Sequence, residues 1–319
     1  MADTGIGIDV TAENELRRLY RENARIIERL TKQLIRELPE AARRAGVERK
    51  DSIETSRIYW PEDYYSILDG VDPYAMVIPD LASRMDSARI DADDDDEVKE
   101  GPLNALVLAM LARYRKAIKR LAGRSKATIK NVGFRIDDTA QKRLMQAARK
   151  AGDRDIAELV GEVDVDHVEW EREQQRLLTA PPTGGSAPKK TPTLIERHMN
   201  AVRAIVLSVA VGVGVDSAIS KMKATIGITK RRADMIGEDQ ALKQHASAVE
   251  EMSAAANIDQ YIWRSQGDSR VRQLHRQRNG QTYDNDHEFN DVSADGPPGV
   301  PPNCRCRRQY VSPRKRQAA

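Results

Sequence analysis

Residues 261–311 read YIWRSQGDSRVRQLHRQRNGQTYDNDHEFNDVSADGPPGVPPNCRCRRQYV and contain both cysteines of the chain. Three short segments in this stretch have the composition of strands: Tyr261–Trp263, Gln281–Tyr283 and Gln309–Val311. The pair Asn279-Gly280 is a strong turn signal, and the Gly/Pro-rich passage Gly296–Pro302 leads to Cys304 and Cys306. Since the stretch has little apolar material for a core, we expect a small unit of short antiparallel strands held by polar or metal contacts.

Upstream of this stretch, the sequence has the periodicity of amphipathic helices. Apolar residues recur at three-to-four spacing over residues 11–38, and we expect this helix to stop at Pro39. Further helices are expected over residues 103–121, 139–150, 154–178, 194–222 and 229–256, the last with a bend near Gly237. Charged residues make up 32% of the chain and aromatic residues 4%, which suits long solvated helices. The predicted fold is mainly α, an elongated helical body with a small C-terminal α+β module.

Composition also predicts the division of the chain. Residues 179–193 (TAPPTGGSAPKKTPT) are rich in Pro, Gly, Ser and Thr and have no apolar period, as in a linker. We therefore expect an N-terminal helical region at 1–178 and a C-terminal domain with a basic tail at 194–319. Residues 51–87 hold an aromatic cluster interrupted by prolines, either a packing cluster or a docking patch, and the acidic block 91–100 is expected to form a loop.

Several classes of protein are disfavoured. The net charge is only +3, so no global field indicates a nucleic-acid binder. The first ten residues lack the basic and apolar regions of a signal peptide, and the apolar stretch 204–215 is too short to span a bilayer. A disulfide within Cys304-Arg305-Cys306 would close a small, strained ring, so we expect reduced thiols and synthesis in a reducing cytoplasm.

The C-terminal part carries a series of motifs in a fixed order. They are Arg232-Ala233-Asp234-Met235-Ile236, Glu238-Asp239-Gln240, Tyr261-Ile262-Trp263-Arg264, Asp268-Ser269-Arg270-Val271-Arg272, His275, Asn279-Gly280, and Gly296-Pro297-Pro298-Gly299 leading to Asn303-Cys304-Arg305-Cys306. In order and spacing, residues 230–311 resemble the tailed-phage head morphogenesis proteins, the minor head protein family that includes the F protein of phage Mu. The resemblance is loose over 194–229, and the first 180 residues carry no matching motif.

The resemblance implies a minor structural protein of a virion, made in the host cytoplasm. Such proteins are located inside the head near the portal and assist head morphogenesis and DNA packaging or delivery. The implied partners are the portal protein, the major capsid protein, or both, together with packaged DNA. The resemblance implies neither an enzyme nor a membrane protein.

The residues of the motif block allow two interpretations of its chemistry. In the first, Cys304, Cys306 and His275 bind zinc, with His287 or Asp268 as the fourth ligand of a tetrahedral site. Such a site would stabilise a unit with too small a core, although a one-residue gap between cysteines is tighter than the usual finger spacing.

The second interpretation is a structural polar network without metal. Asp268 pairs with Arg270 or Arg272, and His275 donates to a backbone carbonyl. The two cysteines then pack as small apolar side chains. Both interpretations stay open at the level of the sequence.

Two further functions depend on particular side chains. In the first, the chain is a zinc-dependent or Cys/His-based nuclease or hydrolase carried in the head. Its base and nucleophile are Asp268 with His275, or Cys304 with His275. This enzyme is the alternative function. Separately, basic residues near the C-terminus can neutralise phosphates of DNA without reading its sequence. They are Arg307, Arg308, Arg314, Lys315 and Arg316.

Overall fold

A computed structural model describes most of the helical body and most of the motif block. The described residues are 8–47, 94–179, 193–209, 213–269, 271–287, 289, 296–301 and 303–312. The aromatic segment 51–87 lies outside them, as does nearly all of the predicted linker 179–193.

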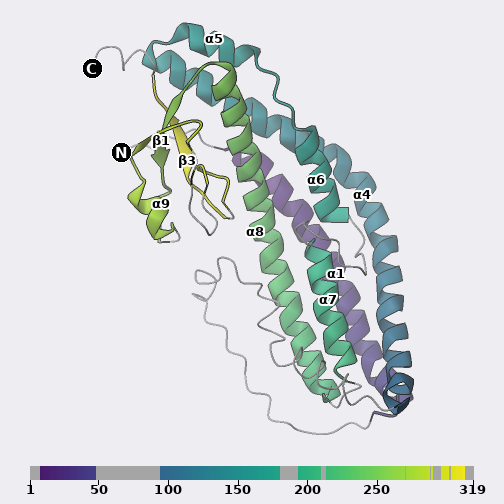
Figure 1. The fold of residues 1–319 in the computed structure, drawn as a ribbon. Helices are drawn as coiled ribbons and strands as arrows, with labels where there is room; N and C mark the ends of the chain where they lie inside the picture. Colours follow the sequence, from purple (N-terminus) through teal and green to yellow (C-terminus); the bar gives the residue numbers. More distant parts are fainter. Residues whose placement is uncertain are drawn as a thin grey trace. The chain divides into compact units, whose positions relative to one another are not determined.

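In these ranges the chain forms seven helices and three strands (Figure 1). The helices are α1 (Val10–Arg44), α4 (Asp94–Ala151), α5 (Arg154–Glu162), α6 (Val168–Thr179), α7 (Leu194–Leu207), α8 (Val215–Ala255) and α9 (Gln273–Gln277). The strands are β1 (Gln260–Arg264), β2 (Thr282–Asp284) and β3 (Arg307–Tyr310). The prediction of a mainly helical protein with a small C-terminal antiparallel sheet is confirmed, and each strand overlaps its predicted segment.

Two helices are longer than their periodicity suggested. α1 continues through Pro39 to Arg44, since the residues after the proline are strong helix formers and Ala41 and Ala42 pack inside. The helices predicted over 103–121 and 139–150 are one helix, α4, because buried apolar residues continue the period between them. These residues are Ile129, Val132 and Ile136.

The acidic block and two other predicted segments also differ from expectation. Residues 94–100 are helical and begin α4, so the loop prediction for this part of the block is wrong. The predicted helix 154–178 divides at residues 163–167 into α5 and α6. The predicted helix 194–222 ends at Leu207, and α8 begins at Val215 beside the glycines of the Gly-Val-Gly-Val segment. α8 is then unbroken through Gly237.

The chain forms two compact units, each assembled from segments far apart in the sequence. The first unit contains Met1–Leu19, Lys126–Gln174 and Met235–Ala319, and the second contains Tyr20–Ser125 and Gln175–Asp234. Both units therefore use residues from both sides of the predicted linker. No helix in the described ranges is long and apolar enough to cross a bilayer.

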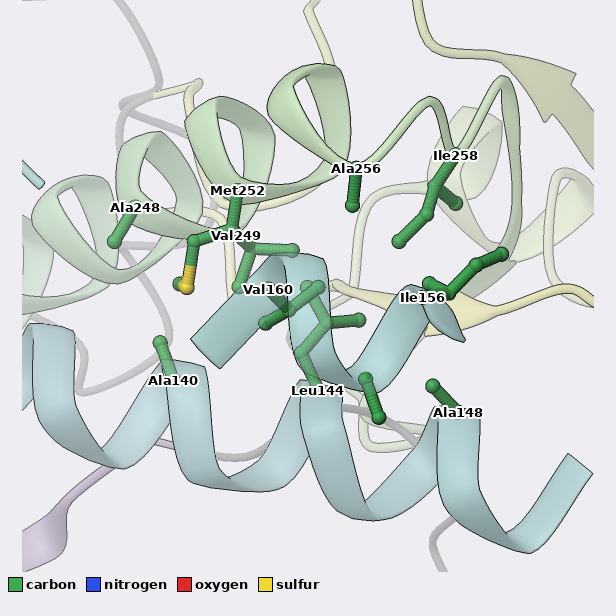
Figure 2. Close-up of a cluster of buried hydrophobic side chains, with 11 residues drawn as sticks. Ala140, Leu144, Ala148, Ile156, Val160, Ala248, Val249, Met252, Ala256 and Ile258 are labelled. Atoms are coloured by element: carbon green, nitrogen blue, oxygen red, sulfur yellow. The ribbon is translucent and has the colours of Figure 1, made fainter. Parts of the chain in front are cut away.

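The core of the first unit lies where α4, α5 and α8 meet. Figure 2 shows the small side chains and Leu144 of α4 facing those of α8, with Val160 of α5 beside them. The i, i+4 spacing of Ala140, Leu144 and Ala148 places these residues on one face of α4. Tyr310 of β3 packs against the same cluster, which ties the last strand to the helices.

The sheet has the order β2-β1-β3 and is antiparallel throughout. In the central strand β1, burial alternates, so that Tyr261 and Trp263 face inward. Tyr261 lies opposite Tyr283 of β2 and Tyr310 of β3. The central strand therefore supplies the largest apolar side chains of the module.

His198 is a core residue of the second unit. Its Nε2 lies 2.8 Å from the hydroxyl of Thr31 on α1, and its Nδ1 lies 2.6 Å from the hydroxyl of Thr229 on α8. Both ring nitrogens therefore have a polar neighbour, and each hydroxyl also donates to the carbonyl four residues earlier in its own helix. Complete burial lowers the pKa of His198 to about 3.

The buried imidazole predicts a pH dependence of stability. Above its ordinary pKa of about 6.5, His198 is neutral in both the folded and the unfolded chain. As the pH falls from there toward 3, only the unfolded chain takes up the proton, so the free energy of unfolding decreases by at most about 1.4 kcal/mol per pH unit. Denaturant unfolding between pH 7 and pH 4.5 should show that the free energy of unfolding decreases more steeply with falling pH for the wild type than for His198→Gln. Equal slopes for the two proteins would contradict this role.

Candidate functional site

The first part of the motif block forms a turn between β1 and β2. The N–H of Gly280 donates to the carbonyl of Trp263 at 2.8 Å, and the side chain of Asn279 accepts from the N–H of Ser265 at 3.0 Å. Gly280 has a φ of +87°, a conformation that L residues with a side chain rarely adopt. The Asn279-Gly280 pair therefore fixes the return of the chain to the sheet after the short helix α9.

The second part of the block is a loop anchored on α8. The backbone N–H of Asn303 donates to the carboxylate of Asp239 at 2.6 Å. Gly299 has a φ of +86°, and a Cβ at this position would lie 2.9 Å from the Cβ of Ala246. Only glycine allows this close approach of loop and helix, so Asp239 and Gly299 together position the cysteines that follow.

Three side chains from separate parts of the module meet at one point. His275 comes from α9, while Cys304 and Cys306 precede β3. The Nδ1 of His275 lies 3.4 Å from the sulfur of Cys304 and 3.6 Å from that of Cys306. All three residues are buried, and their donor atoms lie within 4.8 Å of one another. We call these residues the His/Cys cluster.

The two thiols of the cluster are electrostatically unequal. A hydrogen bond with Cys306 lowers the pKa of the Cys304 thiol to about 4; burial opposes this shift, and His275 and the Gly299 N–H assist it. The same hydrogen bond, burial and the charge of Cys304 raise the pKa of Cys306 well above its ordinary value. Of the two sulfurs, Cys304 is therefore the one on which negative charge is favoured.

Aromatic rings surround the cluster. Trp263 is fully buried, and its ring meets the imidazole of His275 edge-on with centroids 5.0 Å apart. Phe289 lies 5.7 Å from Trp263 on another side, and the guanidinium of Arg278 lies over both rings. With Tyr261 and Tyr283, these rings are the apolar core of the module.

The structure separates the other predicted zinc ligands from the cluster. His287 is exposed, and its ring contacts Tyr283 and Phe289 with centroids 5.1 Å and 4.6 Å away. Asp268 pairs with the guanidinium of Arg305. Among the described residues, neither His287 nor Asp268 belongs to the group of donor atoms that His275, Cys304 and Cys306 form.

The described residues show one ion pair that the predicted polar network did not include. Asp268 pairs with Arg305, which lies between the cysteines, and this ion pair joins the loop after β1 to the segment before β3. Arg270 lies outside the described residues. Arg272 precedes α9, and its charge lowers the pKa of Cys306 slightly, so the guanidinium acts on the cluster.

Arg308 requires a correction to the set of DNA-contact residues. Its side chain is 3% exposed and donates to Glu250 of α8 at 2.8 Å and to Asn285 at 3.0 Å. Its guanidinium also lies 4.7 Å from the centre of the Tyr261 ring. Because these contacts occupy it inside the protein, Arg308 is not open to a phosphate. Arg307 is half-buried, and Arg314, Lys315 and Arg316 lie outside the described residues.

The site offers one catalytic-looking pair but no visible room for a substrate. Cys304 and His275, drawn as nucleophile and base, do meet at 3.4 Å. However, Cys304 is only 3% exposed, and the cavity beside Cys306 and Gly299 has a volume of about 10 Å³. That is room for one water molecule at most.

Sequence reasoning missed several residues that hold the module in place. The hydroxyl of Tyr310 donates to Asp153, at the turn between α4 and α5, at 2.7 Å. Trp170 of α6 donates to the backbone carbonyl of Gln240 at 3.1 Å. These partners lie far upstream, and a single sequence gives no signal for such pairings. Asp239 and Gln240 were noted only as parts of a motif, without a role.

Comparison with known proteins matches the segment that builds this site. Residues 201–309 match the family described as "Phage Mu protein F like protein", which confirms the resemblance found in the sequence for this segment. The chain is also 34% identical over 79 residues to an uncharacterized protein of Haemophilus influenzae. That alignment covers 24% of this chain and 17% of the relative, so the chain covers well under two thirds of the relative's length. No solved structure matches significantly.

The contacts of Arg308 predict that this side chain stabilises the module. Arg308→Met keeps an apolar stem but removes the hydrogen bonds to Glu250 and Asn285, so the free energy of unfolding should fall by about 1–3 kcal/mol. Arg43→Met, at a position where the side chain is 73% exposed, is the matched control and should change it by less than about 0.5 kcal/mol. Guanidinium denaturation followed by tryptophan fluorescence measures both. Equal effects would refute a specific role for Arg308.

Proposed function

We propose that this chain is a minor structural protein of a tailed-phage virion, located inside the head near the portal. The family match over residues 201–309 carries the proposal. That segment includes the second half of α7, all of α8, strands β1 and β2, most of β3 and the His/Cys cluster. The proposed role is to assist head assembly and DNA packaging or delivery.

The geometry of the site supports an assembly role over a catalytic one. The His/Cys cluster is buried, and the residues around it fasten the loop at 296–306 and the sheet to α8. A module built this way presents a fixed outer surface to a partner without needing a substrate pocket. The proposed partners are the portal protein, the major capsid protein, or both.

Contact with packaged DNA is a further part of the proposal. Arg307 together with Arg314, Lys315 and Arg316 gives a concentration of positive charge at the end of the chain, whose overall net charge is only +3. Such residues bind phosphates without sequence preference. Arg308 is excluded from this set by its burial.

The alternative function is a Cys/His-based nuclease or hydrolase carried in the head. The contact of Cys304 with His275 at 3.4 Å is the observation in its favour. A hydrolase or nuclease assay on the wild type and on His275→Ala separates the two functions. An activity that is clear in the wild type and lost in the variant would establish the enzyme.

The assembly role predicts that the chain is carried in purified heads. In a phage whose own copy is disrupted, the wild-type chain and Val300→Ala should be found in heads by mass spectrometry and should restore infectivity. Trp263→Ala removes the largest buried side chain of the module at a cost of about 3–5 kcal/mol and should do neither. Val300 is the control because its side chain is 40% exposed. Heads that lack the wild-type chain and infect normally would overturn the proposal.

The DNA contact predicts a salt-dependent affinity that depends on the tail. Replacing Arg314, Lys315 and Arg316 by alanine should weaken binding to random-sequence DNA and lower the slope of log K against log salt by roughly 2–3. The matched control removes three exposed charges from α4, at Lys116, Lys119 and Arg120. Fluorescence anisotropy at several salt concentrations measures the slope. The same loss in both variants would argue against a specific role for the tail.

A further inference from the structure

We propose that His275, Cys304 and Cys306 bind one zinc ion, which fastens α9 to the segment before β3. The ion is a structural clamp for the C-terminal module. This inference is independent of the proposed role in the phage head, because it depends only on the three side chains and their surroundings.

The distances in the His/Cys cluster fit a tetrahedral zinc ion. With Zn–S bonds of about 2.3 Å and a Zn–N bond of about 2.0 Å, tetrahedral angles separate a sulfur from the nitrogen by roughly 3.5 Å. The two observed separations from the His275 Nδ1 are 3.4 Å and 3.6 Å. Two sulfurs on such an ion lie roughly 3.8 Å apart, inside the 4.8 Å that encloses all three donor atoms.

The convergence of both sulfurs on the same ring nitrogen favours a shared ion over a plain hydrogen-bond network. A neutral imidazole nitrogen either donates one proton or accepts one, so the Nδ1 of His275 satisfies at most one of the two sulfurs, and the other depends on the hydrogen bond between the thiols. A cation placed between the three atoms uses the lone pair of the nitrogen and a charge on each sulfur at once. It also neutralises the negative charge that buried thiolates would otherwise carry.

One N–H group already donates to a sulfur of the cluster, and a second N–H group is buried in the same apolar core. The backbone N–H of Gly299 donates to the sulfur of Cys304 at 3.5 Å. The indole Nε1 of Trp263 is buried and has no hydrogen-bond partner among the described residues, and Trp263 belongs to the same buried cluster as Cys304 and Cys306. A metal-bound thiolate is a better acceptor for such N–H groups than a neutral thiol, and groups of this kind tune metal sites.

The donor set selects the class of metal. Two thiolates and one imidazole suit a borderline-soft divalent ion such as zinc and disfavour magnesium or calcium, which take oxygen ligands. The chain supplies three ligands, and an exchangeable ligand such as water takes the fourth position. His287 is not the fourth ligand, since its exposed ring packs against Tyr283 and Phe289.

The position of the cluster explains what an ion would contribute. His275 and Cys304 are 29 residues apart in the sequence, so a shared ion closes a long loop across the module. The buried apolar core that it would reinforce is small, with Tyr261 and Trp263 as its large side chains. Metal binding then contributes directly to the folding of the module.

The test begins with the full-length wild type, purified without chelator. We expect one zinc per chain by inductively coupled plasma mass spectrometry. Removal of the metal should lower the thermal midpoint by roughly 5–10 °C, the shift expected for a ligand present at about 100 times its Kd, and zinc alone should restore it. After loading with Co²⁺, the protein should show a thiolate charge-transfer band. Folded wild type without stoichiometric metal, and with no midpoint shift on adding zinc, would overturn the proposal.

Variants separate the three-ligand site from the rival arrangements. Cys306→Ser and His275→Ala should lose the metal, whereas His287→Ala should keep one zinc per chain and the same midpoint. Because a ligand variant can simply misfold, circular dichroism at low temperature accompanies each measurement, and the wild-type metal content decides the case by itself. Loss of zinc from His287→Ala, or its retention by Cys306→Ser, would refute the three-ligand site. Neither outcome bears on whether the chain is found in phage heads.

Discussion

The C-terminal module depends on one constraint, which is that it has too little apolar material to fold by itself. Its buried core contains Tyr261, Trp263 and the two cysteines, with Tyr283 and Phe289 partly buried beside them. A three-stranded sheet with strands of three to five residues is marginal without further support. The contacts between the module and the helices compensate for this small apolar core.

Support comes from helices of the same unit at three points. Asp239 of α8 accepts from the N–H of Asn303, Glu250 of α8 pairs with Arg308, and Asp153 accepts from Tyr310. The first two contacts join residues near the end of the described chain to α8, and the third joins Tyr310 to the turn between α4 and α5. The helices thus supply a rigid surface, and the sheet and loop are fastened to it mainly by hydrogen bonds and ion pairs.

The sequence predicted the elements of the fold better than their connections. Alternating and three-to-four periodicity located the strands and most helices, because burial of one face leaves a local pattern. The fusion of two predicted helices into α4 was missed because the charged residues between them masked Ile129, Val132 and Ile136. At the site, Cys304, Cys306 and His275 were singled out by residue type. Arg308 was misjudged because its basic neighbours suggested a tail, while its partner Glu250 lies 58 residues upstream.

The burial of His275, Cys304 and Cys306 favours a structural role for these side chains. An active site must admit its substrate, but Cys304 and His275 are buried at 3% and 2% exposure. The block nevertheless combines thiol, imidazole, aromatic and glycine residues at fixed positions, which a solvated surface loop does not need. Side chains of this kind, turned inward and anchored on α8, act on the protein itself. The segment that identifies the chain as similar to a phage head protein is thus the segment whose chemistry maintains the shape of the module.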